Sequence, residues 1–493
     1  MTYSKILKRS FAVGLTISPL VLGGCGLVKQ MEAHSTSDRG LNEVSSQTAA
    51  ITGQQPVWVR NKEDAEFLQA KVSSLVKGRT ISADAAVQVA LLNNKRVQVA
   101  FADVGLSAAD AWQQTMLENP KVSIGLLGIA HPEIGAIRAI EGMIAANILA
   151  IATRNSRMEL ADNRFRQAKL RAVEETLSVA AEARTAWINA VAAFETVHFL
   201  NKAQISADAS SELALKLGET GAIPKGAQAR EHVFFAELSG QRAQARLAAR
   251  LAKEELTRVM GLWGSDLNYF VPDFLPSLPN YVRQKPSIEA EALRNRVDLK
   301  AAKLELDAMA KSYGLTHATR YVTDLEIISG FEAERELEDG EKKWTTTPQV
   351  ELEFVIPIFD SGQARLRKAE LAYKKAALVL AEKAINIRSE ARSAQTAYLA
   401  TYEIARHYRD AVVPLRIQIE EEALLTYNGM ISSTFELLAD NRAKTNAILQ
   451  AANSKRDFWL ANASLSGAIF GGGAGGAAMS GGTEMVAGGG AEH

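Results

Sequence analysis

Two stretches of this chain place small and apolar residues at alternating steps of three and four over unusual lengths. The first predicted helix runs from about residue 156 to 217, which is 62 residues or roughly 90 Å of helix. The second runs from residue 362 to about 425. Heptad spacing of this kind predicts long helices packed closely along a seam. The seams include Leu170, Leu177, Ala180, Trp187 and Val191 in the first helix, and Leu366, Ala369, Tyr373, Ala376 and Leu380 in the second.

The second long helix carries an additional apolar stripe. Leu371, Leu378 and Ile385 lie seven residues apart and off the main seam. A solvated surface helix needs one apolar stripe, whereas two stripes indicate neighbours on both sides. The pattern therefore predicts a helical sheet or tube.

Shorter helices flank these two, and the halves of the chain align with one another. We expect helices over 81–117, 225–260, 286–313 and 433–465, the first ended by Asn119-Pro120. Residues 90–94 match 292–296 at an offset of 202, and residues 217–223 match 425–431 at an offset of 208. Chance similarity between alanine-rich helices is the alternative, but two ordered matches favour an internal repeat. We assign the repeats to 81–265 and 288–467, joined by a linker over 266–287.

The second repeat contains two segments whose apolar residues alternate with acidic ones. In the segment 349–358, Val350, Leu352 and Phe354 point one way, and Glu351 and Glu353 point the other. The segment 319–331 is a weaker partner, with Asp324 and Glu326 on its polar side, and we expect the charged residues 332–343 to form an exposed hairpin loop. In a transmembrane barrel the apolar face meets lipid and the charged face meets a water-filled lumen. A half-buried strand of a soluble sheet is the alternative.

The first repeat should hold the corresponding strands near 121–130 and 142–152. The second of these is apolar on both faces and is equally compatible with helix.

The N-terminus has the pattern of a secretory signal. Lys5, Lys8 and Arg9 precede an apolar run that ends at Leu22, and small residues lead to Cys25, the only cysteine. We expect residues 1–24 to be a signal peptide, 25–80 to be an acylated cysteine with a polar tether, and the Gly- and Ala-rich residues 468–493 to be a disordered tail. An ordinary buried cysteine is the alternative to acylation.

Composition argues against several classes of protein. The 56 basic and 56 acidic residues cancel, so no charge excess indicates nucleic-acid binding. The seven histidines lack metal-ligand spacing, and no nucleotide-binding or hydrolase motif occurs. We therefore predict neither an enzyme nor a bound cofactor or metal.

Three motifs, in order, resemble the TolC-type outer-membrane efflux channel family over about residues 80–467. Ile356-Pro357-Ile358-Phe359-Asp360-Ser361-Gly362 resembles the family's junction between strand and helix. Tyr427-Asn428-Gly429, followed by Ser432, Phe435-Glu436-Leu437-Leu438 and Arg442, resembles the tip of its second helical hairpin. Asn119-Pro120 resembles the pair before its first strand. Cys25 directly after small residues resembles the lipobox of bacterial lipoproteins, in which the thiol is acylated. Gly26 follows it where an aspartate would favour the inner membrane in Gram-negative lipoproteins, so this resemblance implies the outer membrane.

The resemblance implies a mainly α fold with a small β part and long antiparallel hairpins. It implies a homotrimer in which each protomer gives four strands to one transmembrane β-barrel, while the helices form an α-barrel through the periplasm. The partners would be outer-membrane lipid, a periplasmic membrane-fusion adaptor and an inner-membrane pump of a tripartite efflux or type I secretion-like system. The rival interpretation is a periplasmic structural or adaptor lipoprotein with a coiled-coil hairpin body and no barrel.

The resemblance also assigns residues. Acidic gate candidates are Glu436 and Asp440, although Ala439 occupies a position that is often acidic in relatives, and solvated surface charge is the alternative. Candidates for contact with the adaptor at the hairpin tips are Gly221, Ala222, Ile223, Gly429, Met430, Ile431 and Ser432; turn chemistry alone also explains the glycines. Candidates for the barrel lumen are Glu351, Glu353, Asp324 and Glu326.

Overall fold

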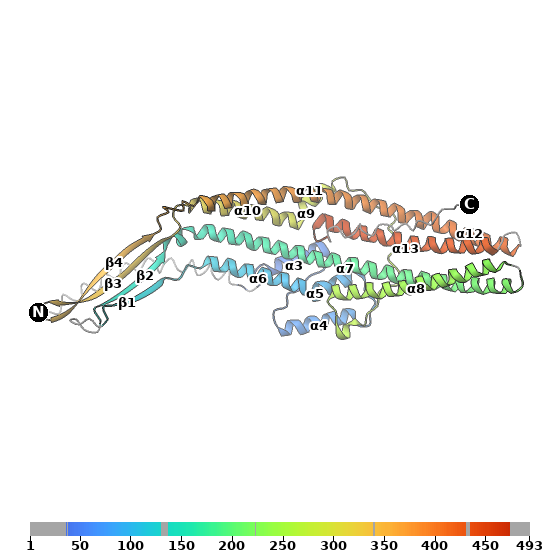
Figure 1. The fold of residues 1–493 in the computed structure, drawn as a ribbon, viewed down its shortest axis with the longest axis horizontal. Coiled ribbons are helices and arrows are strands. Elements are labelled where there is room, and N and C mark those ends of the chain that lie inside the picture. Colours follow the sequence, from blue (N-terminus) through green and yellow to red (C-terminus); the bar gives the residue numbers. More distant parts are fainter. Residues whose placement is uncertain are drawn as a thin grey trace. The chain divides into compact units, whose positions relative to one another are not determined.

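The computed structural model describes residues 36, 38–129, 137–221, 223–338, 341–429 and 434–473. They form long helices and one four-stranded antiparallel sheet, which confirms the predicted fold class (Figure 1). The chain divides into two compact units. The first contains residues up to 42 with 102–169 and 300–382, and the second contains 43–101, 170–299 and the residues from 383 onward.

The two halves of the chain repeat one order of elements: two helices, two strands, a long helix and a returning helix. The first half consists of α5 (Ala83–Asn93), α6 (Lys95–Thr115), β1 (Lys121–Leu127), β2 (Ala139–Asn147), α7 (Ile148–Glu219) and α8 (Lys225–Met260). The second consists of α9 (Ile288–Asn295), α10 (Val297–Ala318), β3 (Leu325–Glu338), β4 (Glu341–Phe354), α11 (Gln363–His407), α12 (Val413–Asn428) and α13 (Thr434–Phe470). A π-helical turn, Tyr408–Val412, separates α11 from α12.

The predicted helices 81–117 and 286–313 are each interrupted once, at equivalent positions. Asn94 separates α5 from α6, and Arg296 separates α9 from α10, again 202 residues later. Both residues take non-helical ψ angles, 129° and 121°. The side-chain amide of Asn94 is buried and donates to the carbonyl of Val259 at 2.8 Å, a partner 165 residues away. Tertiary contacts therefore outweigh the local helical pattern at this break.

The segment 25–80, expected to be a tether, contains two further helices, so that prediction was wrong in part. Helices α3 (Leu41–Thr52) and α4 (Lys62–Val76) occupy much of it. In α4 the buried side chains recur every four residues, at Leu68, Val72 and Val76. This spacing gives the helix a continuous apolar stripe, which a flexible polar tether would lack.

The C-terminal tail 468–493 is also partly ordered, against expectation. Its first three residues complete α13, and Gly472 then approaches α7 so closely that a β-carbon there would lie 2.5 Å from the backbone of Leu177. Cys25, the signal 1–24 and residues 474–493 lie outside the described residues.

The sheet has the strand order β1-β2-β3-β4, and every neighbouring pair is antiparallel. The predicted strand 142–152 instead covers 139–147, because the side chain of Asn147 accepts a hydrogen bond from the amide of Ala150 at 2.8 Å. This is an N-cap, and it starts α7 where the sequence predicts more strand. The other predicted boundaries also shift: β3 begins at Leu325 rather than 319, and β4 ends at Phe354 rather than 358.

The hairpin loop predicted over 332–343 was wrong. Strands β3 and β4 remain paired through this segment as far as Glu338 opposite Glu341. Its acids occur at every second position, Glu332, Glu334, Glu336 and Glu338. Period two is the period of a strand, so a dense charge run with this spacing is compatible with strand pairing rather than a loop.

The inter-repeat linker, which contains a 3₁₀ turn at Gly264–Leu267, is held by side chains from three helices of the second unit. The buried carboxylate of Glu195 in α7 accepts from the amide of Leu275 at 3.0 Å. Tyr402 in α11 donates to the carbonyl of Asn280 at 2.8 Å, and Trp459 in α13 donates to that of Pro276 at 3.1 Å. The linker thus fastens α7, α11 and α13 to one another. None of the helices in the described part of the chain has the length and apolarity to cross a membrane.

A buried ion pair marks the break between α9 and α10 and generates a pH prediction. Asp298, whose side chain is 6% exposed, binds Arg296 at 2.9 Å and lies 3.4 Å from Lys383. Burial is the largest single influence and raises the pKa of this carboxyl, but the hydrogen bonds and charge of Arg296, the charge of Lys383 and the amide of Leu299 together outweigh burial and lower the pKa. A lowered folded-state pKa stabilises the fold above the unfolded value of about 3.9, and this stability is lost as pH falls through the folded-state value.

We expect Asp298→Asn to lower the free energy of unfolding at pH 7 by about 1–3 kcal/mol, because a charge-assisted hydrogen bond is lost in a buried site. The deficit should shrink as pH falls below about 4. Denaturant unfolding in detergent at pH 7 and pH 3 measures both effects. The matched control is Asp457→Asn at an exposed pair with Arg456, which should change stability by less than about 0.5 kcal/mol. A constant deficit at both pH values would contradict the assignment.

Candidate functional site

The register of the four strands sorts their side chains into one apolar and one polar face. Val122, Ile144, Ser329 and Val350 lie side by side across the sheet on the apolar face. The same face carries Ile124, Leu126, Ile140, Leu325, Ile327, Phe331, Leu352 and Phe354. The opposite face is mainly polar: beside the apolar Leu127, Met143 and Ile328, it carries Lys121, Glu141, Asn147, Glu326, Glu332, Glu334, Gln349, Glu351 and Glu353.

The apolar face of the sheet is exposed, with Val350 at 79%, Ile124 at 76% and Val122 at 67%. On the central strand β3, Ile327 and Phe331 of this face are exposed, whereas Glu332 and Glu334 of the polar face are half-buried and Glu326 is 9% exposed. On the edge strand β4, Glu351 and Glu353 are exposed as well. The central strand therefore shields its acids while its apolar side chains are exposed.

Cross-strand contacts tie the polar face together. Lys121 on β1 binds Glu326 on β3 at 2.7 Å, reaching over β2 where Ala145 leaves room. Gln349 on β4 donates to Glu332 at 3.0 Å. Arg138, next to β2, binds Glu334 on β3 at 2.8 Å. These links join β1, β4 and the residue before β2 to the central strand β3 through charges and an amide.

The structure brings three of the four lumen candidates onto this polar face. Glu326 lies directly opposite Glu353, and Glu351 is two residues further along β4. Asp324 precedes β3 and accepts a hydrogen bond from the amide of Asn147 at 3.4 Å. The sequence analysis does not include Glu332 and Glu334, because it predicts a loop over 332–343. Their spacing of two residues, which is the period of a strand, is the signal that could have placed them on this face.

The junction between β4 and α11 has the features that suited the resemblance. The carboxylate of Asp360 accepts from the amide of Gly362 at 2.8 Å, and Arg320 donates to the carbonyl of Ser361 at 2.9 Å. Gly362 has a φ of +72°, and a β-carbon there would lie 2.8 Å from the carbonyl oxygen of Arg320. Glycine is therefore required both by backbone conformation and by space at the start of α11.

The described hairpin-tip candidates are Gly221, Ile223 and Gly429. Gly221 follows α7 with a φ of +75°, and Ile223 is half-buried as its amide donates back to the carbonyl of Leu217 at 3.4 Å. Gly429 caps α12, with its amide 2.9 Å from the carbonyl of Leu425. Ala222, Met430, Ile431 and Ser432 lie outside the described residues.

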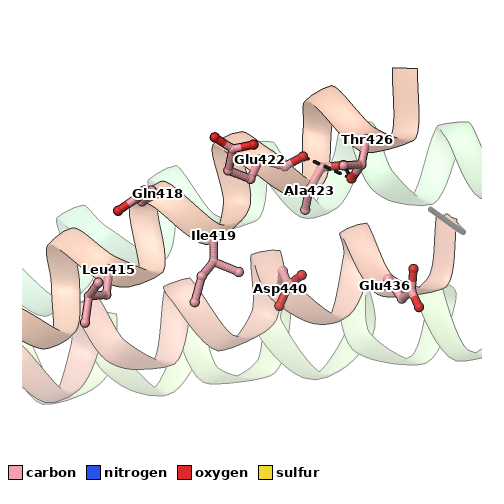
Figure 2. Close-up of a pocket in the computed structure, with 8 residues that line it drawn as sticks. All are labelled: Leu415, Gln418, Ile419, Glu422, Ala423, Thr426, Glu436 and Asp440. Atoms are coloured by element: carbon pink, nitrogen blue, oxygen red, sulfur yellow. Dashed lines mark hydrogen bonds between the residues drawn. The ribbon is translucent and has the colours of Figure 1, made fainter. Parts of the chain in front are cut away.

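Both gate candidates line one cavity of about 520 Å³ between α12 and α13. Glu436 and Asp440 lie on α13, and Figure 2 shows the side chain of Ile419 pointing from α12 toward α13, next to Asp440. A third acid, Glu422 on α12, also lines the cavity and was missed by sequence reasoning. Leu415 and Ala423 add an apolar part to the lining. The lining thus includes two acids of α13 and one of α12, although Figure 2 shows the Glu422 carboxylate on the side of α12 away from Glu436 and Asp440.

Arg442, two residues after Asp440 on α13, links this hairpin to α8. Its guanidinium binds Glu231 at 2.5 Å and lies 4.3 Å from the centre of the Phe234 ring. The side chain of Glu231 is 6% exposed. Because the carboxylate of Glu231 is buried and bound by the guanidinium of Arg442, we infer that this ion pair holds α8 and α13 together.

We expect Arg442→Gln to loosen the contact between α8 and α13, because it leaves the buried carboxylate of Glu231 without its cation. Hydrogen–deuterium exchange should quicken in residues 228–236 and 438–446. Adding Glu231→Gln to the same chain should recover much of the protection, since no buried charge then remains. Equal exchange in the single variant and the unmodified protein would show that the pair does not hold the helices.

Comparisons with solved structures identify the same fold in outer-membrane channels. CusC matches with a TM-score of 0.65 and 15% identity, over 79% of this chain and 92% of CusC. The Campylobacter jejuni outer-membrane channel CmeC matches with a TM-score of 0.64 and 18% identity, over 85% of this chain and 89% of CmeC. The outer-membrane protein VceC of Vibrio cholerae matches with a TM-score of 0.64 and 15% identity, over 84% of this chain and 99% of VceC.

No protein-family model and no curated protein sequence matches the chain. Within the described residues, no group of histidine, cysteine or carboxylate side chains is arranged to hold a metal ion. At these identities the structural matches establish the TolC-like fold.

Proposed function

We propose that the chain is the subunit of a trimeric outer-membrane channel, a passive conduit from the periplasm to the exterior. The observation that carries this proposal is one sheet face with exposed apolar side chains on all four strands, while the acids of the central strand β3 are shielded on the other face. Removing one large apolar side chain from water is worth about 1.5–3 kcal/mol. A row of such residues on one sheet face is stable when hydrocarbon covers it, and costly when water does.

The dimensions of the apolar face suit a bilayer. On β4 it extends from Trp344 to Phe354, which is eleven positions, and a tilted transmembrane strand needs about 9–11. Trp344 lies opposite Arg335, whose guanidinium is 5.6 Å from the ring. Tryptophan beside a charged group is typical of the interface between lipid and water. The opposite face, with Glu351 and Glu353, then meets a wet lumen.

The unpaired edge strands of the sheet and the exposed apolar stripe on α11 indicate that further copies of the chain pack against this one. Strands β1 and β4 are the two edges of the sheet, and unpaired edge groups are unstable in lipid. Three copies with four strands each close the barrel in the arrangement that the resemblance implies. On α11, Leu371, Leu378 and Ile385 are 49%, 71% and 66% exposed, so this stripe is available for a neighbouring copy.

A periplasmic adaptor lipoprotein without a barrel is the second candidate. It is favoured by the long hairpins alone, and it leaves the apolar sheet face in water. The inverted exposure of β3 favours the channel. In that setting, the hairpin tips and the acid-lined cavity with Glu436 and Asp440 form the periplasmic entrance, which would bind an adaptor and pump of an efflux or type I secretion-like system.

The proposed lipid at Cys25 is within reach of the same membrane. Arg39 is fixed to α7 by Asp162 at 3.2 Å and by the Phe165 ring at 4.5 Å. Asp162 lies 15 residues along α7 from the end of β2, or about 22 Å. The 14 residues from Cys25 to Arg39 span up to about 50 Å, so the tether is long enough.

The main test changes the polarity of each face of β4 in turn. We expect Glu351→Leu with Glu353→Leu to reduce trimer yield and single-channel conductance, because both faces of the strand become apolar and its lumen side no longer wets. Conductance in planar bilayers and cross-linking of the trimer measure these effects. Leu352→Lys, on the opposite face, should prevent insertion by placing a charge in lipid at about 2–4 kcal/mol. Val350→Leu is the neutral control. Unchanged conductance in the double variant would remove Glu351 and Glu353 from the lumen.

A second test addresses the trimer. We expect Leu378→Glu to weaken trimer formation, because it would bury a carboxylate between neighbouring helices. Light scattering of the detergent-solubilised protein measures the mass. The control is Lys374→Gln, which removes an exposed pair with Glu370 on the same helix. Persistence of a full trimer in Leu378→Glu would place the interface elsewhere.

A third test addresses the anchor. We expect Cys25→Ser to block acylation and to lower the mass of the mature N-terminal peptide by the lipid, as measured by mass spectrometry. Incorporation of a labelled fatty acid into the unmodified protein and its absence from the variant would support the anchor. Absence of label from both would contradict it.

A further inference from the structure

The loop that joins β4 to α11 exposes a run of apolar side chains. This junction loop, residues 355–362, follows the last residue of β4 and precedes Gln363. Ile356 is 64% exposed, Ile358 is 75% exposed and Phe359 is fully exposed. Single exposed apolar residues are common on protein surfaces, but neighbouring ones that form a patch mark a surface that binds something apolar.

Two arginines lie beside the end of the junction loop. Arg320, two residues after α10, donates from its Nε to the carbonyl of Ser361 at 2.9 Å. A β-carbon on Gly362 would lie 2.9 Å from the Cγ of Arg320 and 3.4 Å from a terminal guanidinium nitrogen of Arg365. Both arginines therefore lie next to the same glycine, although they are 45 residues apart in the sequence.

The charge of these two arginines is only partly compensated. The carboxylate of Asp360 is 3.8 Å from the Nε of Arg365, and it accepts a hydrogen bond from the amide of Gly362 at 2.8 Å. Arg320 lies over the ring of Tyr321 at 4.9 Å, and no carboxylate in the part of the chain that the structure describes forms an ion pair with it. Two cations beside one distant carboxylate leave a positive charge at this end of the loop.

An apolar surface followed by a positive charge matches the chemistry of a phospholipid. The acyl chains need apolar contact, and guanidinium groups bind phosphate through paired, charge-assisted hydrogen bonds. The loop continues directly from β4, whose apolar face the proposed function places in hydrocarbon. The headgroup layer adds about 5–8 Å to each side of the hydrocarbon core, so residues just beyond the strand lie at its level. Tyr321, 58% exposed, is typical of such an interface.

The first repeat has no equivalent surface. Its strand β2 ends at Asn147 and α7 begins at Ile148, so no loop separates them. The first arginine of α7, Arg154, is 9% exposed and donates to the carbonyl of Thr115 at 3.0 Å. Its guanidinium is therefore turned into the protein, and the pairing of exposed apolar residues with accessible cations belongs to the second repeat.

We propose that Arg320 and Arg365 bind the phosphate of a phospholipid in the periplasmic leaflet of the outer membrane, with its acyl chains against Ile358 and Phe359. The placement of this surface at a membrane rests on the proposed channel function. The bound lipid covers the apolar side chains of the junction loop and neutralises the charge that Asp360 leaves. Each chain carries one such site.

Native mass spectrometry of the full-length trimer in detergent tests the site, with dioleoyl phosphatidylglycerol as the probe. Dioleoylglycerol, which has the same acyl chains and no phosphate, is the comparison lipid. We expect one phosphatidylglycerol per chain and weak retention of dioleoylglycerol. Arg365→Gln should lower retention of phosphatidylglycerol about tenfold or more, because charge-assisted hydrogen bonds are lost. Arg365 is the residue of choice because Arg320 also holds Ser361.

The matched control is Arg367→Gln, which removes the same charge from the same helix at an exposed pair with Glu370. It should change retention by less than about twofold. Arg365→Lys, which keeps the charge, should retain more lipid than Arg365→Gln. Equal retention in Arg365→Gln and the unmodified protein overturns the site, and so does an equal loss in Arg367→Gln. Displacement of the lipid by inorganic phosphate alone would show a site for free anions instead.

A photoreactive amino acid in place of Phe359 tests the acyl-chain contact in the same trimer. We expect illumination to give an adduct with the mass of one phosphatidylglycerol. A cross-link between two chains would show that a neighbouring copy covers the junction loop, and would overturn the lipid site.

Conductance and trimer mass distinguish this proposal from the proposed function. If the trimer forms and conducts but Arg365→Gln retains lipid normally, the lipid site fails and the channel stands. If neither trimer nor conductance is found, yet the chain in detergent retains phosphatidylglycerol in a manner that depends on Arg365, the lipid site stands and the channel fails.

Discussion

The pairing of β2 with β3 is the contact on which the functional part of the molecule depends. It joins the strands of the first repeat to those of the second, and its register aligns Asn147 with Glu326 and Ile144 with Ser329. A slip of one residue would move every acid of one repeat onto the apolar face of the other. The polar links from Lys121 to Glu326 and from Arg138 to Glu334 fix this register, because each crosses from the first repeat to the second.

The two repeats share the same order of elements but differ in the structure of their long hairpins. Both contain the same break, at Asn94 and Arg296, and both end in a hairpin. The first hairpin continues as an uninterrupted α7 with a buried cluster, while the second is interrupted at Tyr408–Val412 and leaves α12 exposed. The linker held by Glu195, Tyr402 and Trp459 keeps the helices of the second unit together.

Much of the fold could be predicted because it follows from local periodicity. The helix expected over 225–260 is α8, Lys225–Met260, and the alternation around Glu351 and Glu353 placed both acids on one face. Prediction failed where a single side chain changes the local geometry. Asn147 starts a helix inside an apolar run, and the acids at 332–338 extend a strand that resembled a loop. The sequence also marked Glu436 and Asp440, but it contained no signal that Glu422 would join them across the hairpin.

The sequence by itself determined the long helices, the repeat and the two-faced strands, because side-chain spacing of 3.6 and 2 residues is a property of neighbours along the chain. The tertiary structure alone decided which strand edges pair, that β3 exposes its apolar side chains and shields its acids, and that Arg442 reaches Glu231 and Asn94 reaches Val259. Those contacts join residues between 165 and 211 positions apart. Their geometry depends on how whole elements pack, and local spacing carries no information about that.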